Sequence, residues 1–458
     1  MSHCFDTLYS WVKDLPIVDW HNHLDLGMIA ADRPLGSLYE VWVKSDPYKH
    51  RAMRICGEPE RVITGDAPES EKWDAWTRTL PKLVGNPLFA WAKMEIEWLF
   101  GSGKFKVESG RLAMENVSLA DLTPSKVLKK FNVEYISPCV GAGESLTGFT
   151  RFTGLRDEKG ITPVNPVNPV QKTYKVLPSL RMNAGDEISI EALEKFDSAG
   201  CCVVDVSVDD VAKLSTPNSQ LATVAAYAAA HGWTMLLHMG ALRETSARLR
   251  AAAGPAGGFA GMRAPIDPAA VAAFLNALEV GDFSHKGHKE HKGSLPRTIL
   301  MSLNPEAHAS LAVLAGSFNG AGMPGKVQLG PAWWWCDHEE GIRDVLEKNA
   351  AYGVISTFVG MTTDSRSLLS FVRHDYFRRV LCRWVAEKVA SGAFPDDESL
   401  LRPMLEGICH KNAHDMIFGH EEHKARKNAF ASGSLGVLEN VTSTSDLQDS
   451  KTPRSGSN

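Results

Sequence analysis

Eight apolar, β-rich runs recur along the 458-residue chain, and helical patterns separate most of them. Several of these runs are continuously apolar, as strands buried on both faces are. Alternating strand and helix patterns imply parallel βαβ units, and eight such units suggest a closed barrel. We therefore predict an α/β fold built as a (β/α)8 barrel, with a doubly wound open sheet as the alternative. The predicted strands are residues 16–24, 133–140, 173–181, 201–208, 234–243, 297–305, 326–335 and 354–366.

One long interval interrupts this alternation. More than a hundred residues separate the first two predicted strands, which is too long for a bare loop. Residues 71–100 carry aromatic side chains at helical spacing, so we predict an inserted helical subdomain over about residues 33–130. The rest of residues 1–430 is predicted to form a single barrel domain. Residues 431–458 are rich in Ser, Thr and Gly with few large apolar residues, which predicts a disordered tail.

Composition argues against several classes of function. A hydrophobic content of 44% is enough for a large core, and a net charge of -5 does not indicate a nucleic-acid partner. The chain has no long uncharged apolar run and no apolar signal core at its start, so we expect neither a membrane span nor secretion, but a cytoplasmic protein. Its eight cysteines are scattered without a CxxC pair, which favours reduced thiols.

Polar side chains gather at the ends of the predicted strands, where barrels of this kind have their active sites. The first run ends in Asp-Trp-His-Asn-His, and strand residues two apart point to the same side. His21 and His23 could therefore share one metal ion, although a lone His-x-His can also be incidental. Asp364 ends the last run, which lies beside the first in a closed barrel and can reach the same ion. His238, in the fifth run, is either a ligand or acid–base group at the barrel mouth or a core histidine.

Three arginines follow strand ends, namely Arg181, Arg243 and Arg366. Arginine is well suited to bidentate capture of a carboxylate, so three around one mouth indicate an anionic substrate. Asp205 ends the fourth run, where it could orient an arginine or move a proton. Trp333 begins a run of three tryptophans that could line a sugar pocket, although at least one of them is expected in the core.

Longer segments resemble the uronate isomerases of the amidohydrolase superfamily. The resemblance covers roughly residues 10 to 425 and begins with the HNH tripeptide that ends the first predicted strand. The other matching segments are DPYKHRAMRICG (46–57), GNPLFAW (85–91), LLHMGALR (236–243), SLNP (302–305), GKVQLGPAWWW (325–335) and FVGMTTDSRSLLSFVRHDYFRR (358–379). Members of this family interconvert aldose and ketose sugar acids, such as glucuronate with fructuronate and galacturonate with tagaturonate.

The resemblance implies an irregular (β/α)8 barrel of the metal-dependent hydrolase type that holds a divalent metal, which we expect to be one Zn²⁺. It implies that the chemistry is a metal-assisted proton transfer from C2 to C1, with Asp364 or a metal-bound water, assisted by Tyr48, as the base. By resemblance, the metal ligands are His21, His23 and Asp364, the catalytic residues are Asp364, Tyr48, His238 and Asp205, and the substrate-binding residues are Arg181, Arg243, Arg366 and Trp333.

The sequence also departs from the family pattern. Pro47 stands where a His usually precedes the tyrosine, and Val206 stands where a His usually follows the fourth-strand Asp. The segment ISPCVGAGE (136–144) lacks the usual Asp at the end of the second strand. These departures leave open which hexuronate is preferred.

Two other functions are alternatives to a uronate isomerase. One is a metal-dependent hydrolase or decarboxylase on the same barrel, and the other is a catalytically silent paralogue that binds a sugar acid. The inserted helices are a candidate surface for a homo-oligomer.

Overall fold

The computed structural model describes residues 4–419 except 115–118, 145, 147–173, 215–218, 256, 264–265, 282–294 and 321. All of these residues belong to the unit Met1–His420. The tail for which we predicted disorder, residues 431–458, lies outside the described residues.

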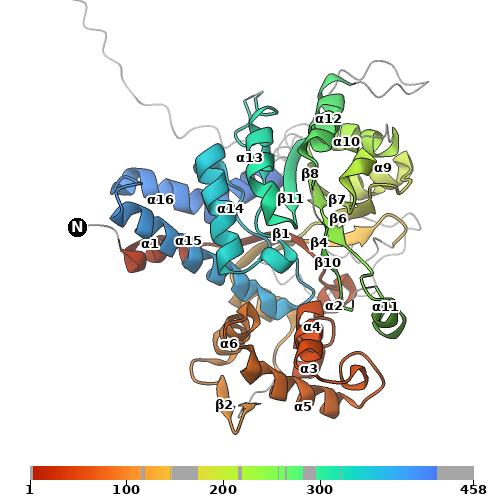
Figure 1. Cartoon of the computed structure of the whole chain (residues 1–458), viewed down its shortest axis with the longest axis vertical. Helices are drawn as coiled ribbons and strands as arrows, with labels where there is room; N and C mark the ends of the chain where they lie inside the picture. The colour runs from red at the N-terminus through yellow and green to blue at the C-terminus, as the bar shows by residue number, and fades with distance from the viewer. Residues whose placement is uncertain are drawn as a thin grey trace, which may run out of the picture. The chain divides into compact units, whose positions relative to one another are not determined.

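A curled sheet of parallel strands forms the centre of this unit, which confirms the predicted α/β barrel architecture (Figure 1). Its order is β1 (Ile17–Asn22), β4 (Val133–Gly141), β6 (Ser179–Asn183), β7 (Val203–Val208), β8 (Thr234–Met239), β11 (Arg297–Ser302) and β12 (Val327–Leu329), with β5 (Lys175–Val176) paired to β4. Every residue of β1, β7, β8 and β11 is buried, as expected for strands covered on both faces.

Helices connect the strands and cover the sheet. They are α7 (Pro124–Lys130), α9 (Ile190–Ser198), α10 (Ser219–His231), α11 (Ala247–Ala253), α12 (Pro268–Val280), α13 (His308–Gly316), α14 (Glu339–Tyr352), α15 (Val372–Ala390) and α16 (Glu398–Glu406), with α1 (Phe5–Val12) packed on α15 and α16. Helices α9, α10, α13 and α14 lie between the later strand positions, as the predicted alternation requires, and α15 follows the eighth position. No helix among the described residues is both long and apolar enough to cross a membrane.

The predicted eighth strand, residues 354–366, is not a strand. It begins with the 3-10 turn η6 (Ile355–Thr357) and continues as irregular chain. Two residues interrupt the extended backbone, because Gly360 has φ +75° and Asp364 has φ +48°, and both values lie in the left-handed region. A Cβ on Gly360 would approach the Ile408 carbonyl oxygen to 2.1 Å, so only glycine fits there.

This irregular segment, residues 358–366, nevertheless takes the eighth position of the barrel. The Val359 amide donates to the Gln328 side chain of β12 at 2.8 Å. On its other side, the Asp364 amide donates to the His21 carbonyl of β1 at 3.1 Å. The segment therefore closes the barrel between β12 and β1 by a mixture of backbone and side-chain hydrogen bonds rather than by a regular ladder.

The region between β1 and β4 is mostly helical. It holds α2 (Leu26–Ala31), α3 (Leu38–Trp42), α4 (Pro47–Ile55), η1 (Glu60–Val62), α5 (Glu69–Thr79), η2 (Leu80–Leu83), α6 (Pro87–Phe100) and a small hairpin of β2 (Lys106–Glu108) and β3 (Arg111–Ala113). Figure 1 shows α3 to α6 gathered together, in orange and brown. That this insertion forms a subdomain with boundaries near residues 33 and 130 stays a prediction.

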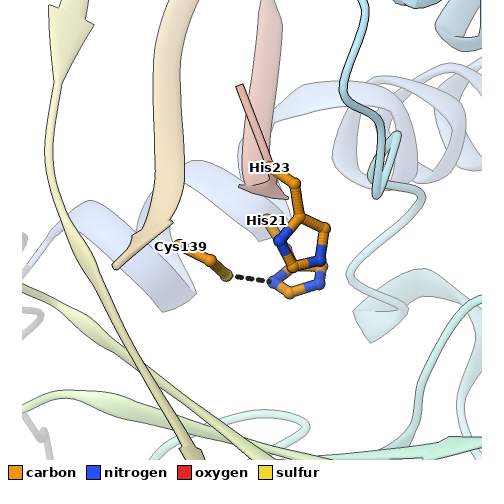
Figure 2. A group of neighbouring side chains, drawn as sticks. All are labelled: His21, His23 and Cys139. Carbon is orange, nitrogen blue, oxygen red and sulfur yellow. Dashed lines mark hydrogen bonds between the residues drawn. The ribbon is translucent and has the colours of Figure 1, made fainter. Parts of the chain in front are cut away.

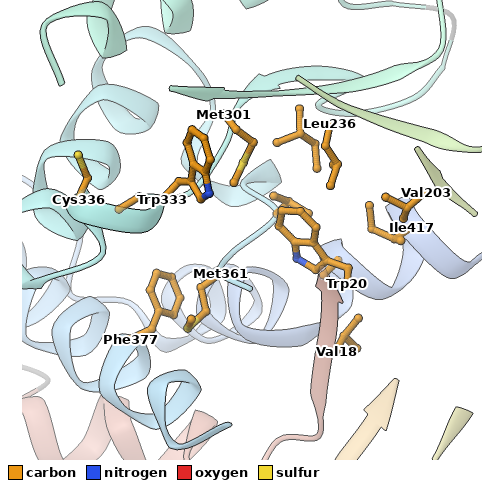
Figure 3. Close-up of a cluster of buried hydrophobic side chains, with 14 of the residues drawn as sticks. Val18, Trp20, Val203, Leu236, Met301, Trp333, Cys336, Met361, Phe377 and Ile417 are labelled. Carbon is orange, nitrogen blue, oxygen red and sulfur yellow. The ribbon is translucent and has the colours of Figure 1, made fainter. Parts of the chain in front are cut away.

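One buried apolar cluster supports the strands (Figure 3). Trp20 of β1 and Leu236 of β8 are fully buried in it, and Met301 of β11 and Trp333, which follows β12, are nearly so. Because interiors are packed as densely as organic crystals, such a cluster leaves the strand ends little freedom to move. Polar side chains at those ends are therefore held in defined positions.

Candidate functional site

His21, His23 and Asp364 meet where β1 and the irregular segment run side by side. Asp364 Oδ1 lies 3.1 Å from Nε2 of His21 and 3.1 Å from Nε2 of His23. The indole N–H of Trp333 donates to the other carboxylate oxygen, Oδ2, at 2.8 Å. The structure thus brings the three predicted metal ligands together and places the predicted Trp333 against one of them.

This donor set fits a divalent metal ion. Two imidazole nitrogens and one carboxylate oxygen are the ligands of many mononuclear sites that keep open positions, zinc sites among them. Ligands with bonds of about 2.0–2.2 Å to one ion lie roughly 3–3.5 Å apart, and Oδ1 of Asp364 lies at such a separation from Nε2 of each histidine. Burial raises the pKa of Asp364, but hydrogen bonds with His21 and His23 outweigh it and hold that pKa well below its usual value. The carboxylate is therefore ionised, as a metal ligand must be.

Asp205 is the centre of a second group at the strand ends. It is fully buried, its Oδ1 lies 2.7 Å from Nδ1 of His238, and its Oδ2 pairs with Arg181. Burial raises the pKa of Asp205, but Arg181 and His238 hold it well below its usual value. Burial also lowers the pKa of His238. The neutral ring donates Nδ1–H to Asp205, and its buried Nε2 has no hydrogen-bond partner within the described part of the chain.

Cys139 joins these two groups, and the sequence analysis did not select it. It lies near the end of β4, with Sγ 3.3 Å from Nδ1 of His21 and 3.5 Å from Oδ2 of Asp205 (Figure 2). Donor atoms of His21, His23 and Cys139 all lie within 4.8 Å of one another, and so do those of His21, Asp205 and His238. The same rule that selected His21, a polar side chain at a strand end, also applies to Cys139. In the segment 136–144, however, the missing Asp was the feature considered, and the cysteine was not.

The three predicted arginines have different surroundings. Arg181 and Arg243 converge on the hydroxyl of Ser207, at 3.1 Å and 2.8 Å, and Arg243 also pairs with Asp209 at 2.9 Å. Arg366 is exposed and lines a cavity beside Asp364. Two of the arginines therefore already hold carboxylates of the protein, whereas Arg366 faces open space.

Tyr48 reaches the site from the insertion. Asp46 caps α4 by accepting from the Tyr48 amide at 2.9 Å, and Pro47 occupies the first helical position, which proline favours. The Tyr48 ring packs edge-on against Trp335 at 5.3 Å between centroids. Burial raises the pKa of Tyr48, so the phenol keeps its proton. Its buried oxygen has no hydrogen-bond partner at ordinary geometry among the residues described.

A small cavity, about 30 Å³ in volume, lies between α4, α6 and residues 364–373. Tyr48, Asp364 and Arg366 line it, together with Arg373. Sequence reasoning missed Arg373, because its position inside α15 gave only a helical signal. The cavity is far smaller than the roughly 300–1,000 Å³ of typical ligand sites. It admits a water or a single hydroxyl, so a larger ligand on this face requires exposed side chains such as Arg366 to move.

Comparison with known proteins places these features in a family. A family model described as glucuronate isomerase matches residues 2–151 and 204–417. A uronate isomerase of Caldicellulosiruptor bescii is 34% identical over 452 residues, which cover 88% of this chain and 94% of that protein. A uronate isomerase of Bacillus licheniformis is 31% identical, with 88% of this chain and 93% of that protein covered.

Solved structures show the same fold. The uronate isomerase of Thermotoga maritima matches with a TM-score of 0.75 at 23% identity, covering 91% of this chain and 98% of its own. The glucuronate isomerase of Caulobacter crescentus matches with a TM-score of 0.71 at 19% identity, covering 90% and 93%. At these identities the likeness concerns the fold alone.

Proposed function

The chain belongs to the glucuronate isomerase family, and from this premise we propose that it is a uronate isomerase. The reaction interconverts an aldose hexuronate and its ketose isomer, D-glucuronate with D-fructuronate or D-galacturonate with D-tagaturonate. The observation that carries the proposal is the cluster of His21, His23 and Asp364 beside a cavity lined by Arg366 and Tyr48. A metal-ligand set next to an exposed arginine suits a substrate that has both a carbonyl and a carboxylate.

The metal would be held by His21, His23 and Asp364, and we propose that it is one Zn²⁺. When bound, such an ion acidifies the C–H bond next to a carbonyl and stabilises the negative charge that forms when that proton leaves. The neighbouring Trp333 fixes the orientation of the Asp364 carboxylate by its hydrogen bond to Oδ2.

Arg366, the exposed arginine beside Asp364, is the first candidate to bind the substrate. Its guanidinium can donate two parallel hydrogen bonds to the carboxylate of the sugar. Arg181 and Arg243 contribute positive charge around Ser207, although each also serves a carboxylate of the protein. Trp333 supplies an aromatic surface. We propose that the side chains around the small cavity move apart when the hexuronate enters.

The proton transfers are assigned to three side chains. Asp364 removes the proton from C2 of the aldose and returns it to C1, assisted by the phenol of Tyr48, which donates a hydrogen bond to a substrate oxygen. His238 carries the hydroxyl proton from O2 to O1, because its Nε2 lone pair is bare. Asp205 keeps His238 in the required tautomer by accepting from Nδ1–H at 2.7 Å. All atoms of the aldose are retained in the ketose.

We further propose that the protein acts in the cytoplasm on a free sugar acid, without a nucleic-acid or membrane partner. The inserted helices are the proposed site of any homo-oligomer.

The test is proton NMR of the zinc-loaded protein in D₂O with D-glucuronate and, separately, with D-galacturonate. We expect the matching ketose acid to appear, and deuterium at C1 would show that the proton held by Asp364 exchanges with solvent before it is returned. The relative rates rank the two sugars. If neither sugar reacts with folded, metal-loaded protein, the isomerase proposal fails and a silent sugar-acid-binding role takes its place.

A further inference from the structure

A continuous chain of hydrogen bonds links the two groups of the site. Nδ1 of His21 lies 3.3 Å from Sγ of Cys139, and that thiol donates to Oδ2 of Asp205 at 3.5 Å. The other oxygen of Asp205 lies 2.7 Å from Nδ1 of His238. His21 and His238 are 1% exposed and Asp205 is fully buried, whereas Cys139 is half-buried.

The chemistry of the groups sets the direction of each hydrogen bond. Asp205 pairs with the guanidinium of Arg181, and its carboxylate oxygens accept hydrogen bonds. The Cys139 sulfur donates its proton to Oδ2 of Asp205 at 3.5 Å. The sulfur can then only accept from His21, which requires a proton on Nδ1. His238 likewise requires a proton on Nδ1 to donate to Asp205.

In both histidines, therefore, Nε2 is the ring nitrogen that Cys139 and Asp205 do not contact. Nε2 of His21 faces Oδ1 of Asp364 at 3.1 Å, and Nε2 of His238 is buried without a partner in the region described. Metal-binding histidines usually donate their second ring N–H to a group that fixes the tautomer and the ring orientation. Cys139 is in that position relative to His21.

We propose that Cys139 is a positioning residue that holds His21 in its Nδ1–H form and so prepares Nε2 to bind the metal. The inference rests on the proposed function, because it takes His21 as a metal ligand. It also makes Cys139 the connection through which Asp205 orients both histidines, directly for His238 and through the sulfur for His21.

Coordination of the metal by Cys139 itself is the competing role, since a thiolate is a good zinc ligand. The geometry favours positioning. The sulfur contacts Nδ1 of His21, whereas Asp364 contacts Nε2 of the same ring, and Nε2 of His23 approaches the same Asp364 oxygen. Asp364 and the sulfur therefore contact different nitrogens of the His21 ring, and the nitrogen beside Asp364 is the one that would bind the metal.

The first experiment measures Zn²⁺ affinity by competition with a chelator at fixed pH. The variants are Cys139→Ser, which keeps a donor and an acceptor, and Cys139→Ala, which removes both. Cys56→Ala is the control, because Cys56 is a half-buried thiol at the end of α4, outside the site. We expect a loss of about 10–100-fold for Cys139→Ala, recovery of most of it in Cys139→Ser, and no change for Cys56→Ala. Equal affinity of Cys139→Ala and the unaltered protein would overturn the proposal.

A second measurement separates positioning from ligation and does not depend on the alanine variant folding. The unaltered protein is loaded with Co²⁺, and its near-ultraviolet absorption is compared with that of Cys139→Ser. We expect no sulfur-to-cobalt charge-transfer band in either protein. A band that disappears in Cys139→Ser would show that Cys139 is a ligand and would overturn the proposal. Neither measurement uses a sugar, so a failed isomerase assay with the expected affinities would reject the function and leave this inference standing.

Discussion

Two carboxylates lie where the barrel closes, and their surroundings differ: Asp19 is fully buried, whereas the side chain of Asp364 is 15% exposed. Asp19 of β1 accepts hydrogen bonds from the Thr362 hydroxyl at 3.0 Å and from the Thr363 amide and hydroxyl at 2.6 and 2.8 Å, and it also pairs with His374 at 3.1 Å. Asp364, on the irregular segment, faces two imidazoles whose Nε2 atoms converge on a single oxygen. Asp19 is surrounded by donors within the protein, whereas the Asp364 arrangement fits an added ion.

This difference distinguishes buried polar groups that stabilise the fold from polar groups that belong to the candidate site. Buried polar groups are normally satisfied, and a satisfied network makes the local structure rigid. Around Asp19 the partners come from β1, the irregular segment and α15, so this network joins three parts of the chain. Near Asp364, the buried atoms without a well-formed hydrogen bond to the described residues include Nε2 of His238 and the phenol oxygen of Tyr48. Unsatisfied buried atoms at a strand end are the stronger indication of chemistry.

Asp364→Asn tests the functional side of this comparison and is expected to have the largest effect. Asparagine keeps the size of the side chain but removes the charge that binds the metal and the base that takes the C2 proton. We expect kcat to fall by about 10³-fold or more, with an unchanged circular dichroism spectrum. Near-normal turnover would remove Asp364 from the role of base.

Asp19→Ala tests the structural side. The substitution removes the acceptor of several buried donors and leaves His374 unpaired, so we expect a loss of about 3–5 kcal/mol in the free energy of unfolding. Denaturant titration measures this loss. Activity per folded molecule, assayed at low temperature with saturating metal, should fall far less than in Asp364→Asn. If Asp19→Ala were fully stable but inactive, the two carboxylates would share a catalytic role.

Arg366→Ala extends the comparison to the substrate. This arginine is exposed, so its removal should not affect folding, but the sugar carboxylate loses a charge-assisted hydrogen bond. We expect a decrease in kcat/KM of about 10–100-fold, mostly through KM. Arg402→Ala, at an exposed pair with Glu398 and Glu406, is the matched control and should behave as the unaltered enzyme. An unchanged KM in Arg366→Ala would move substrate capture to Arg181 and Arg243.

Tyr48→Phe is expected to have the smallest effect on the reaction rate. It tests whether the buried phenol oxygen serves the substrate or the stability of the fold. The phenol oxygen is buried without a well-formed hydrogen bond among the described residues, so removing it should change the free energy of unfolding by less than about 1 kcal/mol. The rate should still fall, by about 10-fold in kcat, because the donor to the substrate is lost. A large loss of stability with unchanged kcat would make Tyr48 a structural residue.

Much of the fold could be predicted from the sequence, because strands covered on both faces leave continuous apolar runs. Seven of the eight predicted strands appear, and the helical patterns tested between them are present. The prediction of the eighth strand, residues 354–366, was wrong for a local reason. Its composition resembles a strand, but Gly360 and Asp364 have left-handed backbone angles that no apolar pattern reveals. The closure of the barrel then depends on side chains such as Gln328 instead of a ladder.

The site shows the same division. The sequence alone determined that His21 and His23 share a side and that Asp364 can meet them, since strand alternation and barrel closure are enough for both. Only the tertiary structure decided that Cys139 links His21 to Asp205. It also decided that Tyr48 and Arg373 share a cavity with Asp364. In the same way, it showed that Arg181 and Arg243 already pair with carboxylates of the protein. The physical reason is separation along the chain. Periodicity predicts the direction of a side chain relative to its own helix or strand. These contacts join residues far apart in the sequence, so they depend on how the elements pack.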